Sequence, residues 1–234
     1  MPHAYELPHL LAGAYVLTSI HSETAQEVQY VATQKDTQRE VLIRSLGKLF
    51  AENATICSDF IEDARACSRV QLPYVSSVIE LLPSDGSWHL VFEGNGADSL
   101  NLLAVSGQKI RNVDMVHLLR NLCELCLYLD AAGINSRPFR LDSVYRNGKE
   151  FLLDNPACAG VRTAQVSNRY LIDAAKALLP LVAGSAMQGR AAGMVKALLS
   201  RVADMPDACS LVAMDMLREL TSLTPLISAE DVIF

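Results

Sequence analysis

The sequence predicts an α+β protein in which an antiparallel sheet precedes a mainly helical region. In the first part, short apolar runs alternate with polar residues and are separated by turn sequences such as Pro83-Ser84-Asp85-Gly86. A single segment with helical apolar spacing interrupts these runs. The expected elements are strands at 14–20, 28–33, 39–46, 75–82 and 88–93 and a helix at 50–69.

From residue 99 onward the pattern is almost entirely helical. The expected helices are 99–106, 112–132, 168–183, 191–203 and 208–220. Pro180 predicts an interruption of the third of these helices. The last apolar residues form a tail, Leu223–Phe234, for which we expect packing against the preceding helices or exposure to a partner.

Composition narrows the function classes. The chain has 234 residues, of which half are hydrophobic and a fifth are charged, and this balance is typical of a globular protein. The net charge of −6 without a Lys/Arg cluster argues against nucleic acid as a partner. The most apolar stretch, residues 170–187, carries Asp173, Lys176 and Pro180, so we expect no membrane span. We find no signal-peptide pattern and expect a cytoplasmic protein.

The six cysteines are scattered at positions 57, 67, 123, 126, 158 and 209. Cys123 and Cys126 resemble half of a redox or zinc motif, but they lie within a stripe of leucines and lack a second pair at zinc spacing. We therefore expect buried core cysteines in a reducing compartment. The five histidines are also dispersed, and we expect neither a metal nor a cofactor.

The most informative stretch is residues 131–154. A long amphipathic segment ends at Gly133, and a polar loop follows at 135–142. Two short apolar runs then flank Asn147-Gly148, which is a strong hairpin signal, and the second run ends at Asp154.

This order resembles the catalytic region of the protein kinase superfamily, where a helix leads into H-R-D-L-x-x-x-N, a hairpin and D-F-G. On that pattern Ser136-Arg137-Pro138 stands at H-R-D, Phe139 at the Leu, Ser143 at the Asn and Asp154 at the Asp of D-F-G. The chain thus resembles a divergent, bacterial-type pseudokinase with degenerate catalytic motifs.

The resemblance implies a bilobal protein-kinase-like fold. Residues 1–93 would form an N-lobe with five antiparallel strands and one helix, preceded by an N-terminal lead at 1–13. Residues 94–234 would form an abbreviated, mainly α-helical C-lobe with a short activation segment and the C-terminal tail.

Other kinase positions also depart from the family pattern. The glycine-rich loop falls on Ser22, Thr24 and Glu27, and the chain has no glycine between positions 13 and 47. We expect Glu27 and its neighbour Glu23 to repel phosphates. The strand signature V-A-I-K reads Val-Leu-Ile-Arg and ends at Arg44.

Two further positions complete the comparison with the family. Asp63 takes the place of the helix Glu. We therefore expect Arg44 and Asp63 to form an ion pair that bridges the strand and the helix and maintains the shape of the fold without contacting a phosphate. The alternative is that Arg44 is an exposed strand residue. Phe92 takes the gatekeeper position, where a bulky side chain narrows the space behind an adenine.

We expect no catalysis, because Pro138 has no carboxylate with which to accept a proton and Ser143 is a poor ligand for Mg²⁺. We therefore favour a regulatory or scaffold module that acts by binding another protein, and we do not expect it to bind a nucleotide. The alternative is a nucleotide-binding sensor or atypical kinase that retains weak ATP binding through Asp154 and Arg44. A third possibility is an unrelated α+β protein.

Overall fold

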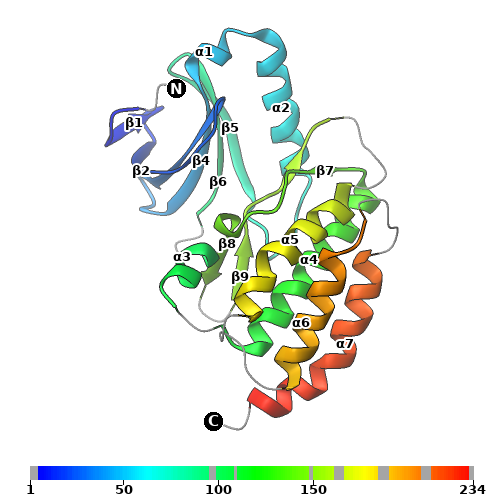
Figure 1. The fold of residues 1–234 in the computed structure, drawn as a ribbon. Coiled ribbons are helices and arrows are strands. Elements are labelled where there is room, and N and C mark those ends of the chain that lie inside the picture. The colour runs from blue at the N-terminus through cyan, green and yellow to red at the C-terminus, as the bar shows by residue number, and fades with distance from the viewer. Residues whose placement is uncertain are drawn as a thin grey trace. The chain divides into compact units, whose positions relative to one another are not determined.

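A computed structural model describes residues 5–94, 99–107, 110–147, 150–160, 166–183, 190–206 and 212–231 (Figure 1). The chain forms two compact units, Met1–Gly96 and Ala97–Phe234. Among the helices that are described, none has both the length and the apolar character needed to cross a membrane.

The N-terminal unit is built on one antiparallel sheet whose strands follow the order β1-β2-β3-β4-β6-β5. The strands are β1 His9–Leu11, β2 Tyr15–Glu23, β3 Glu27–Gln34, β4 Glu40–Leu46, β5 Val78–Ser84 and β6 Ser87–Glu93. All five strands expected from the sequence are present. The expected count was nevertheless wrong, because the N-terminal lead adds β1 as a sixth strand.

Strand β1 forms because the chain folds back tightly after Leu11. Ala12 and Gly13 both have positive φ, and the Ala14 amide donates to the Leu11 carbonyl over 3.1 Å, which closes a β-turn. Leu11 then pairs with Tyr15, so residues 12–14 connect the two strands. Leu11 is fully buried, so this short strand also contributes to the core.

The sheet buries a different set of side chains on each face. One face carries the apolar core of the unit, which draws on all six strands: Leu11, Tyr15, Leu17, Val28, Tyr30, Ala32, Val41, Ile43, Leu82 and Val91. Side-chain bonds also link strands that are not neighbours, from Tyr15 on β2 to Glu80 on β5 and from His9 to Asp85 over 2.9 Å. The sheet therefore curls around this core. The alternate residues of β4, including Arg44, lie on the other face.

Two helices belong to the N-terminal unit, α1 (Lys48–Ala51) and α2 (Ala54–Ser68). The expectation of a single helix at 50–69 was wrong because Asn53 adopts an extended conformation and starts a new helix. Its side chain accepts hydrogen bonds from the amides of Thr55 and Ile56 over 3.0 and 3.2 Å. Helix α2 buries Phe60, Ala64, Ala66 and Cys67.

Gly94 shows why the chain needs a glycine directly after β6. A Cβ atom there would lie 2.4 Å from the Glu40 carbonyl oxygen, and the Gly94 amide donates to that same oxygen over 3.2 Å. Only glycine permits so close an approach of two backbones. Residues 95–98, which follow Gly94, lie outside the described part of the chain.

The C-terminal unit is mainly helical. Its helices are α3 Leu100–Val105, α4 Asn112–Ala132, α5 Val166–Ala183, α6 Arg190–Ala203 and α7 Val212–Asp231. Helix α4 runs through the core, with Leu118, Leu122 and Leu125 at 0% exposure. It ends where the sequence predicts, because Gly133 takes up a left-handed conformation with φ of 67°.

Two expectations about these helices were wrong: the interruption near Pro180 and the end of the last helix at residue 220. Helix α5 continues through Pro180, which is exposed and lies three residues before the helix ends, so the ring displaces only a terminal backbone hydrogen bond. Helix α7 extends to Asp231 and not to 220, so most of the expected tail is helical. Leu223 at its start is 4% exposed, whereas residues 232–234 lie outside the described part.

Two small strand pairings and a 3₁₀ turn complete the described part of the C-terminal unit. β7 (Asn135–Ser136) pairs with β10 (Ala157–Cys158), and β8 (Val144–Asn147) pairs with β9 (Glu150–Leu153). The turn η1 spans Leu141–Ser143. The β8–β9 hairpin was predicted, but its register pairs Asn147 with Glu150, so Asn147 is a strand residue and not part of the turn.

Candidate functional site

The tip of the β2–β3 hairpin occupies the position of the kinase glycine-rich loop. The Thr24 amide donates to the Glu27 carbonyl over 2.8 Å, and the Thr24 hydroxyl accepts from the amides of Gln26 and Glu27 over 3.4 and 3.0 Å. A phosphate cradle needs backbone amides that point at the ligand. Here the amides of Gln26 and Glu27 already donate to a side chain of the same hairpin.

Arg44, on β4, lies among charged and aromatic groups in what we call the guanidinium cluster: Arg44, Glu27, Asp63, Phe60 and Phe92. The Arg44 side chain is only 7% exposed. Its Nη2 atom lies 3.6 Å from Oδ2 of Asp63 on α2, so the expected strand-to-helix ion pair is present. The alternative that Arg44 is an exposed strand residue is wrong.

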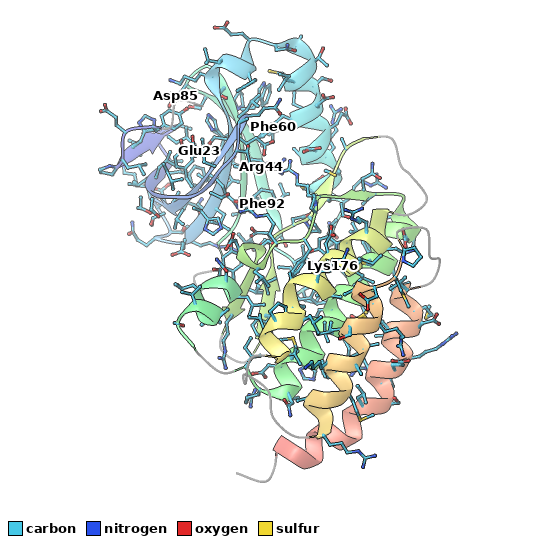
Figure 2. The ribbon with its side chains drawn as sticks, viewed as in Figure 1. Glu23, Arg44, Phe60, Asp85, Phe92 and Lys176 are labelled. Carbon is cyan, nitrogen blue, oxygen red and sulfur yellow. The ribbon has the colours of Figure 1, made fainter. Side chains whose placement is uncertain are left out.

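Two phenylalanine rings flank the guanidinium. The Arg44 Cζ atom lies 5.1 Å from the centroid of the Phe60 ring and 5.9 Å from that of Phe92, and Figure 2 shows the three side chains on β4, α2 and β6. Both distances are within the range of cation–π attraction. Phe92, which the sequence placed at the gatekeeper position, therefore packs beside the cation.

A second carboxylate in the cluster was not foreseen as a partner of Arg44. Oε2 of Glu27 lies 3.6 Å from Nε of Arg44. The strand register pairs Arg44 with Gln29, so Glu27 is a diagonal neighbour on the same face of the sheet. Had we derived that register from the sequence, it would have indicated this contact. The sequence reasoning assigned Glu27 only a repulsive effect on phosphates.

In the C-terminal unit, the resemblance described above places the kinase catalytic loop and the hairpin that follows it at residues 134–158. Backbone bonds join the two ends of this segment: the Arg137 amide donates to the Pro156 carbonyl over 2.8 Å, and Ser136 pairs with Ala157. Phe139 is 7% exposed and packs edge-on against Tyr170, with the ring centroids 5.5 Å apart. Phe139 thus anchors a loop in which Pro138 is exposed.

The residues that follow Pro138 make local contacts. Arg140 and Asp142 form an exposed ion pair with 3.1 Å between Nη2 and Oδ2. The Ser143 hydroxyl donates to the Arg140 carbonyl over 2.7 Å. Ser143 stands at the metal-binding Asn of the family, and here its hydroxyl hydrogen is used within its own turn.

Asp154 lies at the end of β9 and is bonded on both its backbone and its side chain. Its amide donates to the Ser143 carbonyl over 2.8 Å, and its Oδ2 accepts from the Tyr145 hydroxyl over 3.3 Å. Burial raises the pKa of the Tyr145 hydroxyl, and the Asp154 carboxylate raises it further, so Tyr145 stays protonated and donates. These contacts hold Asp154 against the β8–β9 hairpin.

The two cysteines of the candidate redox motif lie on the buried side of α4. Both Cys123 and Cys126 are 0% exposed, and burial raises the pKa of the Cys123 thiol to about 12. A neutral buried thiol behaves as a small apolar side chain. The expectation that they are core cysteines is confirmed.

The sheet with its packed helix and the helical unit with its loop and hairpin together define a protein-kinase-like fold, as the sequence predicted. Solved structures of the kinase domain of PknI from Mycobacterium tuberculosis have this fold. One has a TM-score of 0.69 at 11% identity and covers 95% of this chain and 100% of its own. Another has a TM-score of 0.68 at 12% identity, with 94% and 100% covered. No family model and no curated protein matches the chain.

Proposed function

We propose that this chain is a catalytically inactive, kinase-like module that acts by binding another protein. Pro138 carries the proposal: it stands where the resemblance implies the aspartate that orients the acceptor hydroxyl and takes its proton. Proline has no group that can do either. Asp142, the nearest carboxylate in sequence on the C-terminal side, is engaged by Arg140.

The contacts of the other degenerate positions support the same proposal. The hydroxyl of Ser143 donates to a backbone carbonyl, and the carboxylate of Asp154 accepts from Tyr145. Arg44 lies between two carboxylates of its own unit. Each of these side chains therefore serves local structure, as expected for residues kept to preserve a fold.

Exposed apolar residues on the C-terminal unit favour a protein partner. Leu102 and Val105 lie three residues apart on α3 and are 53% and 80% exposed. Residues at this spacing share one face of a helix, so they present adjacent apolar groups to solvent. Exposed apolar side chains in adjacent positions are typical of surfaces that dock another protein.

Two measurements test the proposal. Transfer of radiolabel from ATP to generic acceptor proteins, with Mg²⁺ or Mn²⁺, should be undetectable for the wild type and for Asp154→Asn alike. Thermal unfolding with and without ATP should coincide, since a ligand present at a hundred times its dissociation constant would add about 2.7 kcal/mol. A shift that Asp154→Asn abolishes would support the nucleotide-binding alternative.

Partner binding is tested by affinity capture from the native cytoplasm with quantitative mass spectrometry. A specific partner should be lost with Val105→Asp. It should be retained with Leu49→Asp, which places the same charge at a residue that is 63% exposed on α1 of the other unit. A partner that both variants lose equally would argue against α3 as the docking element, and capture of no specific partner would reject the binding role.

A further inference from the structure

The guanidinium cluster places two carboxylates beside one guanidinium. Glu27 and Asp63 supply two carboxylates and Arg44 supplies a single cation, with side-chain exposures of 20%, 16% and 7%. The two carboxylates repel one another across the cation, and this repulsion is larger in a partly buried site than in water. Asp63 alone pairs Arg44 with α2, so the approach of Glu27 to the same guanidinium is a separate feature of the β2–β3 hairpin.

The geometry of the two contacts accounts for this feature. Nε and Nη2 form one edge of the planar guanidinium, an edge whose two parallel N–H groups match a single oxyanion. In this structure Glu27 approaches Nε and Asp63 approaches Nη2, each at 3.6 Å. Neither nitrogen forms a hydrogen bond with any part of the chain that the structure describes. The two carboxylates therefore balance the positive charge of this edge, while its N–H groups make no hydrogen bond within the described residues.

Glu27 is held in this position by its own hairpin. The Thr24 hydroxyl accepts from the Glu27 amide over 3.0 Å and donates to the Glu27 carbonyl over 3.2 Å. Glu23, at the other end of the same hairpin tip, is exposed and has no ion pair among the described residues (Figure 2). The hairpin thus directs one of its two glutamates to the cation and leaves the other in solvent.

We propose that Glu27 is a tethered ligand of Arg44: its carboxylate takes the Nε side of the edge that a phosphate group would otherwise bind. Removing that charge opens an oxyanion site in the N-terminal unit. This inference rests on the proposed loss of nucleotide binding and gives it a cause within one hairpin.

Isothermal titration of the full chain with inorganic pyrophosphate tests the inference. Glu27→Gln keeps the shape of the side chain and removes its charge, and it should bind pyrophosphate at least about tenfold more tightly than the wild type. Glu23→Gln removes the same charge from the same hairpin and should bind as the wild type does. The double variant Glu27→Gln/Arg44→Gln should lose the gain. Equal affinities of the Glu27 and Glu23 variants would overturn the inference.

Further arms identify the ligand and guard against misfolding. ATP should bind Glu27→Gln no more tightly than pyrophosphate does, and adenosine should not bind. Adenosine binding without pyrophosphate binding would overturn the inference.

Fluorescence of Trp88, the sole tryptophan, reports whether this unit of each variant is folded. Should the glutamine variant unfold, Glu27→Thr replaces it, since threonine favours strands. ATP binding by the wild type would reject the proposed function, whereas equal Glu27 and Glu23 variants reject this inference alone.

Discussion

Replacing Arg44 by methionine should destabilise the N-terminal unit by about 2–3 kcal/mol. The variant removes the cation that lies 3.6 Å from a carboxylate oxygen of both Glu27 and Asp63. Breaking a fully buried ion pair costs about 3–5 kcal/mol. The two carboxylates are 20% and 16% exposed and lie 3.6 Å from the guanidinium, beyond hydrogen-bond length, so part of that cost is recovered through water. Methionine keeps the apolar contact with the flanking rings, so the loss is mainly electrostatic.

The charge of the unit acts in the same direction. Residues 1–96 carry 12 acidic and 6 basic side chains, whereas residues 97–234 carry 14 of each, so the entire net charge of −6 lies in the N-terminal unit. Removing a buried cation from an already anionic unit increases its self-repulsion. This contribution should shrink as salt is added, whereas the loss of the close contacts should persist.

Urea unfolding followed by Trp88 fluorescence measures the effect within the unit that contains the change. The matched control is Arg39→Met, which removes a cation whose pair with Glu93 is 49% and 43% exposed and should cost about 0–1 kcal/mol. The triple variant Arg44→Met/Glu27→Gln/Asp63→Asn should recover most of the loss, because no unpaired charge remains. Equal losses for Arg44→Met and Arg39→Met would refute the reasoning.

Three further outcomes are expected. Burial lowers the pKa of His89 below 6.5, so the unfolded chain binds the proton at a higher pH than the folded chain does. The free energy of unfolding, followed by Trp88 fluorescence, should therefore be largest above pH 6.5 and should fall below it. His89→Gln should make the free energy of unfolding less dependent on pH. Tyr145→Phe removes the 3.3 Å bond to Asp154 and should lower the unfolding free energy by about 1 kcal/mol in urea. Asn53→Ala removes the α2 cap and should cost about 1 kcal/mol by the same assay.

The His89 and Asn53 outcomes each have a matched control. His117 is exposed on α4, so His117→Gln should leave the pH dependence unchanged. Ser58 is exposed within α2, and Ser58→Ala should not destabilise the unit, since alanine is the better helix former. A pH profile that His89→Gln does not alter, or an Asn53→Ala variant as stable as Ser58→Ala, would contradict the corresponding argument.

Much of the fold could be predicted because periodic patterns and turn residues are local signals. The five predicted strands, the end of α4 at Gly133 and the β8–β9 hairpin all follow from such signals. The predictions that were wrong concerned features that depend on tertiary context. Strand β1 exists because Leu11 fits the core of a curled sheet, and α5 tolerates Pro180 because the residue lies near the helix end and faces solvent.

The guanidinium cluster shows the same limit for sites. Family spacing brought Arg44 and Asp63 together correctly, because a pattern fixes which residues correspond between two chains. It could not indicate that Glu27 reaches the same cation, because that contact depends on the register between β3 and β4 and on the Thr24 turn, which holds the backbone of Glu27. Substitution of a loop glycine has two separable physical effects: the flexible amide cradle is lost, and a side chain is gained. The proposed loss of nucleotide binding needs only the first effect, whereas a closed oxyanion site needs the second, and the pair of glutamine variants distinguishes the two.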